Sequence, residues 1–289
     1  MTLLRSLLAR RDIWHRIAVE RLTEPLHLNV LSLGVAAMRD FRRKVLFDLV
    51  LRQQHAFGLL HAADQAWARG LRRVTAVELG VGGGTGFLNM CEIARRVTAE
   101  TSVEFDLVGF DTGRGMPAPT DHRDHPELYR EGWFPMDRDR LTAALPPNAR
   151  LILGDLATTI DEFASTLDAS APLGFATLDV DFYSSSKHAL RLFDGPAQGY
   201  FPYVTLYVDD IAMPTSNRFG GELLAIDEFN AEHELRKIDV DRTLVTTRVF
   251  KHAEWLSHMY KVHVLDHAER NDRTPPEQTV VVDNPYLVR

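Results

Sequence analysis

Cysteine is nearly absent from this chain, in which Cys91 is the only one. A single thiol cannot form an internal disulfide, so the sequence does not belong to the disulfide-stabilised secreted class. Long apolar runs are also missing: no stretch offers the roughly 20 consecutive apolar residues that a membrane-spanning helix requires. We therefore expect a cytoplasmic protein without a membrane partner. The first residues, Met1 to Arg11, lack acids and faintly resemble a targeting peptide, but a frayed or docking helix is the favoured interpretation.

An excess of positive charge is missing as well. The formal net charge is −7, which argues against a general nucleic-acid-binding surface. The sequence contains no internal repeat, low-complexity tract or evident linker. Its 289 residues are 45% hydrophobic and 25% charged, as in ordinary globular domains. We expect one elaborated α/β domain over residues 71–289, preceded by a helical extension over residues 1–70.

The chain does have a dense glycine cluster at the end of an apolar run. Residues 74–79 predict a buried strand, and residues 87–97 predict a helix; between them lie the glycines, among them Gly80, Gly82 and Gly84. Strand, glycine turn and helix in this order are typical of a nucleotide-type cofactor site. Glycine lets the backbone approach a ligand closely, and a helix begins with free N–H groups.

Glu78, directly before these glycines, distinguishes between two cofactors. A nicotinamide dinucleotide would place its pyrophosphate there, and a carboxylate would repel it. S-adenosylmethionine instead presents a sulfonium and an amino group, both positively charged. We therefore expect S-adenosylmethionine, bound by Glu78, Gly80, Gly82 and Gly84. The alternative is a nicotinamide-dependent oxidoreductase.

Two more acids follow predicted strands. Asp111 ends the strand at 105–110, where one carboxylate can accept hydrogen bonds from both ribose hydroxyls. Asp155 follows the strand at 150–153, and we expect it to accept a hydrogen bond from the adenine amino group. The alternatives are that Asp111 caps the turn before Gly113 and that Asp155 caps the next helix.

Four carboxylates lie at the ends of the next two predicted strands. Asp179 and Asp181 close the segment that begins at Gly174, and Asp209 and Asp210 follow the strand at 203–208. Neighbouring parallel strands end at the same edge of a sheet, so these side chains should converge. Like charges repel, and a hard divalent cation with oxygen ligands relieves that repulsion. We expect Mg²⁺; the alternative is that these acids cap helices and bind no metal.

The remaining segments carry weaker patterns. Residues 112–139 lack periodicity and predict a solvated loop, in which His122, Asp124 and His125 offer a metal site as the less favoured alternative. We expect Ser184 to Ser186 to cap a helix. Helices are also expected around 13–22, 35–51, 57–67, 160–167 and 220–229, and strands at 244–250, 260–265 and 279–282.

Together these motifs resemble the metal-dependent sugar O-methyltransferases of the macrocin type, within the class I S-adenosylmethionine-dependent methyltransferases. They span Val74 to Phe229, roughly half of the chain. The matching pieces are Glu78-Leu79-Gly80-Val81-Gly82-Gly83-Gly84, Gly109-Phe110-Asp111-Thr112 with Gly115-Met116-Pro117, Gly154-Asp155, Leu178-Asp179-Val180-Asp181-Phe182-Tyr183 with the serines after it, Val208-Asp209-Asp210, and Gly221 with Ala225-Ile226-Asp227-Glu228-Phe229.

The resemblance implies a Rossmann-like α/β fold: a mostly parallel seven-stranded sheet with helices on both faces. It also implies that Asp179, Asp209 and Asp210 hold Mg²⁺, which binds two adjacent hydroxyls of the acceptor. The base would be Asp179 or Asp181, with His188 a weaker candidate. The chain departs from the family's usual pattern at Val180, at Gly113-Arg114 and at Tyr200 to Tyr203, near the expected acceptor side.

The expected function is Mg²⁺-assisted O-methylation of a small molecule with vicinal hydroxyls, such as a sugar or a glycosylated natural product. Besides the oxidoreductase, a non-catalytic, methyltransferase-like binding protein is an alternative from a different class. The N-terminal helices are expected to pack on the sheet, cover the cofactor, or join copies of the chain into a homo-oligomer.

Overall fold

The computed structural model describes residues 20–274. The expected helical positions Ile13 to Ala18, the segment Met1 to Arg11 and the β run at 279–282 lie outside the described residues. The elements are α3 (Leu26–Ala37), α4 (Phe41–Leu46), α5 (Gln53–Ala68), β1 (Arg73–Leu79), α6 (Thr85–Thr101), β2 (Glu104–Asp111), η2 (His122–Asp124), α7 (Arg138–Ala144), β3 (Ala149–Leu153), α8 (Leu156–Thr166), β4 (Leu173–Leu178), α9 (Tyr183–Ala189), η3 (Leu190–Phe193), η4 (Ala197–Gly199), β5 (Tyr200–Val208), α10 (Gly221–Glu232), β6 (Arg236–Val240), α11 (Leu244–Thr247), η5 (Glu254–Leu256), β7 (Met259–Val264) and α12 (Ala268–Asn271).

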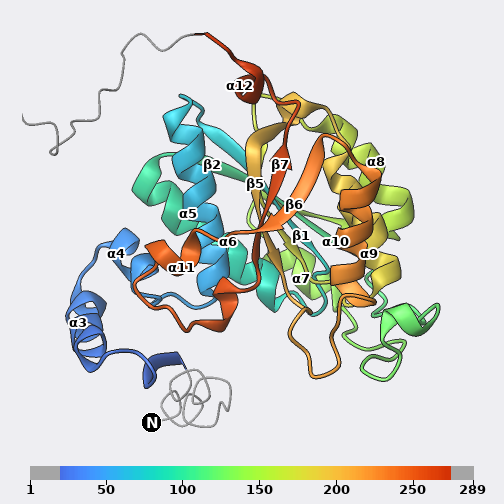
Figure 1. Ribbon diagram of the computed structural model, residues 1–289, viewed down its shortest axis with the longest axis horizontal. Coiled ribbons are helices and arrows are strands. Elements are labelled where there is room, and N and C mark those ends of the chain that lie inside the picture. Colours follow the sequence, from blue (N-terminus) through green and yellow to red (C-terminus); the bar gives the residue numbers. More distant parts are fainter. Residues whose placement is uncertain (1–19, 275–289) are drawn as a thin grey trace, which may run out of the picture.

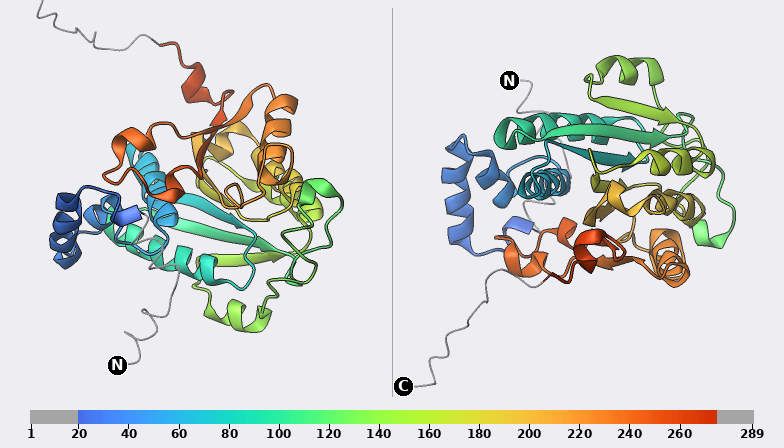
Figure 2. Two further views of the ribbon diagram at one scale, coloured as in Figure 1. Left: turned by 60° about the horizontal axis from the view of Figure 1, so that its bottom comes forward. Right: turned by 90° about the horizontal axis from the view of Figure 1, so that it is seen from above.

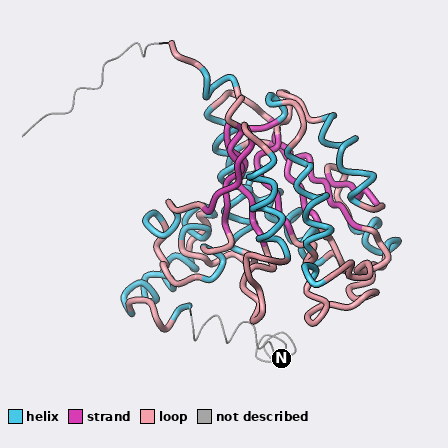
Figure 3. Tube along the Cα trace, turned by 45° about the vertical axis from the view of Figure 1, so that its right-hand side comes forward, coloured by secondary structure: helices cyan, strands magenta, loops and turns pink. Residues whose placement is uncertain are grey.

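The seven strands form one sheet in the order β3-β2-β1-β4-β5-β7-β6. The first five strands pair in parallel, and β7 runs antiparallel between β5 and β6. The predicted Rossmann-like α/β fold, with a mostly parallel seven-stranded sheet, is confirmed. The chain order reverses between β1 and β4, and a ligand crevice is expected beyond the carboxyl ends of strands at such a point. The strands cross the centre of the molecule, and helices lie on both sides (Figures 1 and 3).

Each face of the sheet has its own apolar core. On one face α5 and α6 pack against residues such as Val74 and Ala76; on the other, α8, α9 and α10 cover Val77 and Leu79 (Figure 2). The contact of α5 is close because Gly58 lies on the ring of Phe175: an added Cβ would stand 2.2 Å from it. Every residue of β4 is buried, as expected for a central parallel strand with helices on both faces.

The N-terminal helices differ in how they meet this body. α5 belongs to the expected helical extension, yet it packs directly on β4 and β5. α3 instead exposes apolar side chains: Leu26 is 79% exposed and Leu33 is 74% exposed. The division at residue 70 therefore stays a prediction, and α5 is part of the cover of the sheet. Over the described range, no helix is both long and apolar enough to cross a bilayer.

Two predictions about elements were wrong, and one strand was not predicted. Residues 244–250 were predicted to form a strand, but residues 244–247 form the short helix α11. The edge position of the sheet belongs instead to β6, whose sequence Arg-Lys-Ile-Asp-Val is too charged to stand out as a strand. The helix predicted over 35–51 is divided, because Asp40 caps a new helix by accepting a hydrogen bond from the N–H of Arg43 at 2.9 Å.

Candidate functional site

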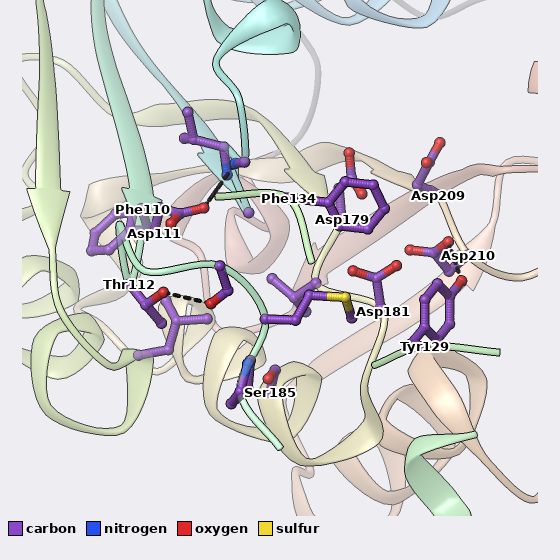
Figure 4. Close-up of a pocket in the computed structure, with 18 of the residues that line it drawn as sticks. Phe110, Asp111, Thr112, Tyr129, Phe134, Asp179, Asp181, Ser185, Asp209 and Asp210 are labelled. Atoms are coloured by element: carbon purple, nitrogen blue, oxygen red, sulfur yellow. Dashed lines mark hydrogen bonds between the residues drawn. The ribbon is translucent and has the colours of Figure 1, made fainter. Parts of the chain in front are cut away.

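A cavity of about 650 Å³ opens beyond the carboxyl ends of the parallel strands. Figure 4 shows Asp111 at one end of it and the carboxylates from the ends of β4 and β5 gathered at the other. All but one of the predicted site residues line this cavity: Glu78, Gly80, Gly82, Asp111, Asp155, Asp179, Asp181, Asp209 and Asp210. Gly84 does not line it; at φ 85° it precedes α6, where an added Cβ would stand 2.5 Å from Leu141.

The glycine turn brings the ends of β1 and β4 into contact. Gly80 has a φ of 89°, and a Cβ there would stand 1.7 Å from the carbonyl oxygen of Asp179. Only glycine fits at such a position. On the following helix, a Cβ at Gly86 would stand 2.5 Å from Oε1 of Glu78. The two glycines thus place Glu78 and Asp179 beside one another at the floor of the cavity.

Glu78 is 3% exposed, and its Oε2 has no hydrogen-bond partner among the described residues. Burial raises the pKa of Glu78 to about 8; the charges of Asp209 and Asp111 act in the same direction, whereas Arg52 opposes them. A buried carboxylate oxygen without a partner is costly. A cationic ligand in the cavity would stabilise its ionised form, and the sulfonium and amino group of S-adenosylmethionine meet that requirement.

Asp111 and Asp155 both have local partners as well as access to the cavity. Oδ2 of Asp111 accepts hydrogen bonds from the backbone N–H groups of Val81 at 3.1 Å and Gly82 at 2.8 Å, and Oδ1 accepts from Gly113 at 2.6 Å. Asp155 caps α8 by accepting from Ala157 at 2.8 Å. The capping alternatives are therefore observed, and the ribose and adenine roles remain predictions.

The carboxylates of β4 and β5 meet as the sequence predicted. Asp179, Asp209 and Asp210 are half-buried, and each offers an oxygen within 4.8 Å of the others. Burial, followed by the charges of neighbouring acids, raises the pKa of Asp179. Burial also raises the pKa of Asp210, whose Oδ2 has no hydrogen-bond partner in the described part of the chain. Mutually repelling oxygens with an unpartnered acceptor among them fit a divalent cation.

Three residues that the sequence interpretation missed hold this cluster. Tyr207 donates its hydroxyl to Asp209 and Tyr129 donates to Asp210, each at 2.7 Å. Glu222, on the first turn of α10, accepts from the N–H groups of Val180 at 3.3 Å and Asp210 at 3.0 Å. Tyr207 could have been found from the sequence, because it lies on β5 only two positions before Asp209. Tyr129 and Glu222 come from elements that only the fold brings here.

Asp181 lies at the end of this cluster, next to Asp210. Its φ is 60°, a conformation that non-glycine residues seldom adopt and that is often found at functional sites. Burial and the charge of Asp210 raise the pKa of Asp181 to about 8. His188, the weaker candidate base, also lines the cavity from α9. Asp179 and Asp181, the two favoured candidate bases, therefore line the same cavity.

The segment 112–139 is mostly exposed loop, as its composition predicted, but a few of its residues are buried against the body of the protein. Asp124 is 0% exposed and accepts hydrogen bonds from both Thr120 and Ser184, and His125 is buried too. The serines do not cap α9, which begins at Tyr183 without a side-chain cap; Asp124 binds the first turn of this helix from the loop instead. The described residues form no metal-type cluster around His122.

A second cavity of about 280 Å³ adjoins the first, and Arg52, Asp209 and Met213 line both. Its walls come from the start of α5 and from the segment before β7. The residues that line only this cavity are Glu20, Gln53, Gln54, Tyr207, Ala212, Glu254, Trp255 and His258. Asp209 is thus the member of the acidic cluster that lies between the two cavities.

No family model and no curated protein matches the chain. Among solved structures, the O-methyltransferase NovP is 15% identical at a TM-score of 0.48, covering 73% of this chain and 79% of that one. The calicheamicin methyltransferase CalS11 is 15% identical at 0.47, covering 82% and 90%. A Mg–SAM structure of cmcI is 16% identical at 0.40, covering 70% of each chain. Scores this low establish neither family nor activity.

Proposed function

We propose that this protein is an S-adenosylmethionine-dependent, Mg²⁺-assisted O-methyltransferase of the macrocin type, acting on a small molecule. One observation carries the proposal. The carboxylate of Glu78, whose Oε2 has no hydrogen-bond partner among the described residues, faces the same cavity as the cluster of Asp179, Asp209 and Asp210, at the point where the strand order reverses. A cationic cofactor and a divalent cation would each neutralise charge that the protein itself leaves uncompensated.

In this proposal Glu78 binds the charged amino-acid end of the cofactor. Gly80 and Gly82 let the backbone approach the cofactor. Asp111 would accept hydrogen bonds from the ribose hydroxyls, and Asp155 would accept one from the adenine amino group. When bound, S-adenosylmethionine supplies a methyl group on a sulfonium, which is already a good leaving group. The protein therefore needs chiefly to align the acceptor oxygen behind that methyl group and to remove a proton.

Asp179, Asp209 and Asp210 would hold the cation. When bound, Mg²⁺ would lower the pKa of an acceptor hydroxyl and fix its position. Asp181 or Asp179 then accepts the hydroxyl proton. Asp181 suits this role because it lines the cavity beside the proposed metal ligands, and carboxylates are among the groups that serve as general bases.

The second cavity gives the remainder of the acceptor a place beside Asp209. Its side chains include both hydrogen-bond donors and acceptors as well as the aromatic rings of Trp255 and Tyr207. Hydroxyl groups both donate and accept, and sugar rings pack on aromatic faces. We therefore propose that the acceptor carries vicinal hydroxyls on a sugar or a glycosylated natural product.

The alternatives receive less support from the site. A nicotinamide dinucleotide would bring a pyrophosphate to Glu78 and the acidic cluster, which would repel it. A non-catalytic binding protein gains nothing from keeping four carboxylates together, since their mutual repulsion opposes folding. Neither alternative has an observation of its own in its favour.

The test is a screen of diol-bearing acceptors, both glycosides and catechols, with methyl-labelled S-adenosylmethionine. We expect label to reach at least one acceptor in the presence of Mg²⁺ and not in the presence of a chelator. The same screen with Asp209→Asn is the matched control for adventitious methylation. Transfer that is equal with and without the chelator would remove the metal from the mechanism.

A further inference from the structure

Arg52 is a cation in an acidic cavity, and within residues 20–274 its side chain has no partner. The larger cavity is lined by seven carboxylates, those of Glu78, Asp111, Asp155, Asp179, Asp181, Asp209 and Asp210. Among its described lining residues, Arg52 is the only lysine or arginine. It is half-buried, yet its guanidinium forms no ion pair and no hydrogen bond with any residue in the range 20–274. A half-buried charge surrounded by acids but paired with none of them is available to a ligand.

The backbone beside Arg52 offers further donors. Arg52 immediately precedes α5, a helix of 16 residues, and no side chain caps that helix end. Its carbonyl accepts from His55 and Ala56, whereas the N–H groups of Gln53 and Gln54 find no acceptor within the described residues. Free N–H groups at the start of a helix favour an anion. Arg52 therefore adds a full positive charge where the helix already favours a negative one.

An independent observation marks the same place as a binding site. As whole residues, Gln53 and Gln54 are 6% and 9% exposed, and neither side-chain amide is hydrogen-bonded to a described residue. Both line the second cavity, where it joins the first at Arg52. Their amide atoms reach the open space of this cavity, where a ligand can supply the hydrogen-bonding groups that the described residues do not.

The position of Glu78 indicates which anion belongs here. If Glu78 binds the cofactor's α-amino group, the α-carboxylate lies on the same carbon, only about 2.5 Å away between the nitrogen and the carboxyl carbon. That carboxylate cannot face the seven acids. Arg52 is close enough to Glu78 for its charge to act on the Glu78 carboxyl. A guanidinium binds a carboxylate through two parallel hydrogen bonds.

We infer that Arg52, together with the first N–H groups of α5, binds the α-carboxylate of S-adenosylmethionine. The inference rests on the proposed function, and it gives α5 a role in cofactor binding besides covering the sheet. The same chemistry would suit a carboxylate on the methyl acceptor, reached from the second cavity. Binding measurements on the cofactor alone separate these two sources.

The experiment compares S-adenosylmethionine with its decarboxylated analogue by calorimetric titration. The wild-type chain should bind S-adenosylmethionine about tenfold or more tighter than the analogue. Arg52→Gln should weaken binding of S-adenosylmethionine about 10- to 100-fold and leave binding of the analogue unchanged. Arg52→Lys should fall between them, because it keeps the charge and loses the paired geometry. Arg72→Gln, an exposed arginine outside both cavities, is the matched control.

Each other outcome overturns the inference. If Arg52→Gln weakens both ligands equally, Arg52 supports the fold of the site and does not recognise the carboxylate. If it changes neither ligand but raises the KM of an acidic acceptor, the carboxylate belongs to the acceptor. If the wild-type chain binds S-adenosylmethionine and the analogue equally well, the carboxylate is not recognised. If it binds neither, the proposed function itself fails.

Discussion

At the scale of single residues, the site depends on Glu78, a buried acid with an unpartnered oxygen. Its pKa of about 8 means that much of it is protonated at neutral pH in the free protein. A positive charge beside the carboxylate favours the ionised form and lowers that pKa. Binding of the cationic cofactor is therefore coupled to release of a proton from Glu78.

This coupling predicts the pH dependence of cofactor binding. A group that loses a proton on binding makes binding tighter as the pH rises, so affinity for S-adenosylmethionine should increase between about pH 6 and pH 8. Calorimetry in two buffers of different ionisation enthalpy measures the protons released, and we expect close to one at the lower end of this range. Glu78→Gln should abolish the release. Heats that do not depend on the buffer would contradict this account of Glu78.

Asp209 provides a second prediction at this scale. Asp209→Asn removes a charge from the repelling cluster but keeps an oxygen for the hydroxyl of Tyr207, so the metal-free protein should be about as stable as the wild type. We expect the variant to lose methyl transfer and the thermal stabilisation by Mg²⁺, about 2.7 kcal/mol for the wild type at a hundredfold excess over Kd. Thermal denaturation with and without Mg²⁺ measures this. The control is Asp227→Asn, which changes an aspartate in an exposed ion pair with Arg218. If Mg²⁺ stabilised Asp209→Asn as much as the wild type, Asp209 would be excluded as a ligand.

At the scale of elements, a buried ion pair joins two segments far apart in the chain. Arg248 follows α11, and Asp48 lies before α5. The guanidinium of Arg248 donates to Oδ1 of Asp48 at 2.6 Å, and both side chains are buried. Arg248 also donates to the carbonyl of Val45 at 2.6 Å. Burial raises the pKa of Asp48, and the charge of Arg248 opposes that shift. The pair fixes the segment that leads into Arg52 and the second cavity.

Breaking this pair should destabilise the fold. Arg248→Leu leaves Asp48 buried without its partner, which costs about 3 to 5 kcal/mol and lowers Tm by about 10 °C in a chain of this size. Arg242→Leu removes an exposed arginine paired with Asp239 and should change Tm by no more than about 2 °C. Differential scanning calorimetry of both variants checks the contrast. Similar shifts would mean that the buried pair does not hold these segments together.

The elements also show what the sequence could and could not predict. The central strands were predicted within one to three residues of their observed ends, because buried parallel strands are continuous apolar runs. The acids that end β4 and β5 were found because they are adjacent to those runs in sequence. Tyr129 comes from a loop, Arg52 immediately precedes α5, and Glu222 belongs to α10; only tertiary packing brings them to the cavity or to the acidic cluster. The charged edge strand β6 lacked an apolar pattern, and the β-branched residues of 244–247 favoured a strand that the sheet does not contain.

At the scale of the whole molecule, α3 exposes an apolar face. Leu26, Val30 and Leu33 follow one another at helical spacing and are 79%, 60% and 74% exposed. Apolar side chains gathered on one exposed face mark association surfaces. We propose that a second copy of the chain covers this face, as a homo-oligomer formed through the N-terminal helices.

Substitution on α3 tests the proposed association. Leu33→Glu should shift the wild-type chain from oligomer to monomer in multi-angle light scattering, because a charge would be buried in the contact. Val245→Glu, on α11, changes another exposed apolar residue and should leave the oligomer intact. A wild-type chain that is monomeric at every concentration would exclude the association.

The most direct test of the proposed cofactor is a calorimetric titration of the purified chain with S-adenosylmethionine and, separately, with NAD⁺, both with Mg²⁺ present. We predict saturable binding of one S-adenosylmethionine per chain, lost in Glu78→Gln, and no heat with NAD⁺. Binding of NAD⁺ without binding of S-adenosylmethionine would contradict the methyltransferase assignment in favour of an oxidoreductase. If neither ligand produced heat, the remaining interpretation would be a non-catalytic binding protein that uses neither cofactor.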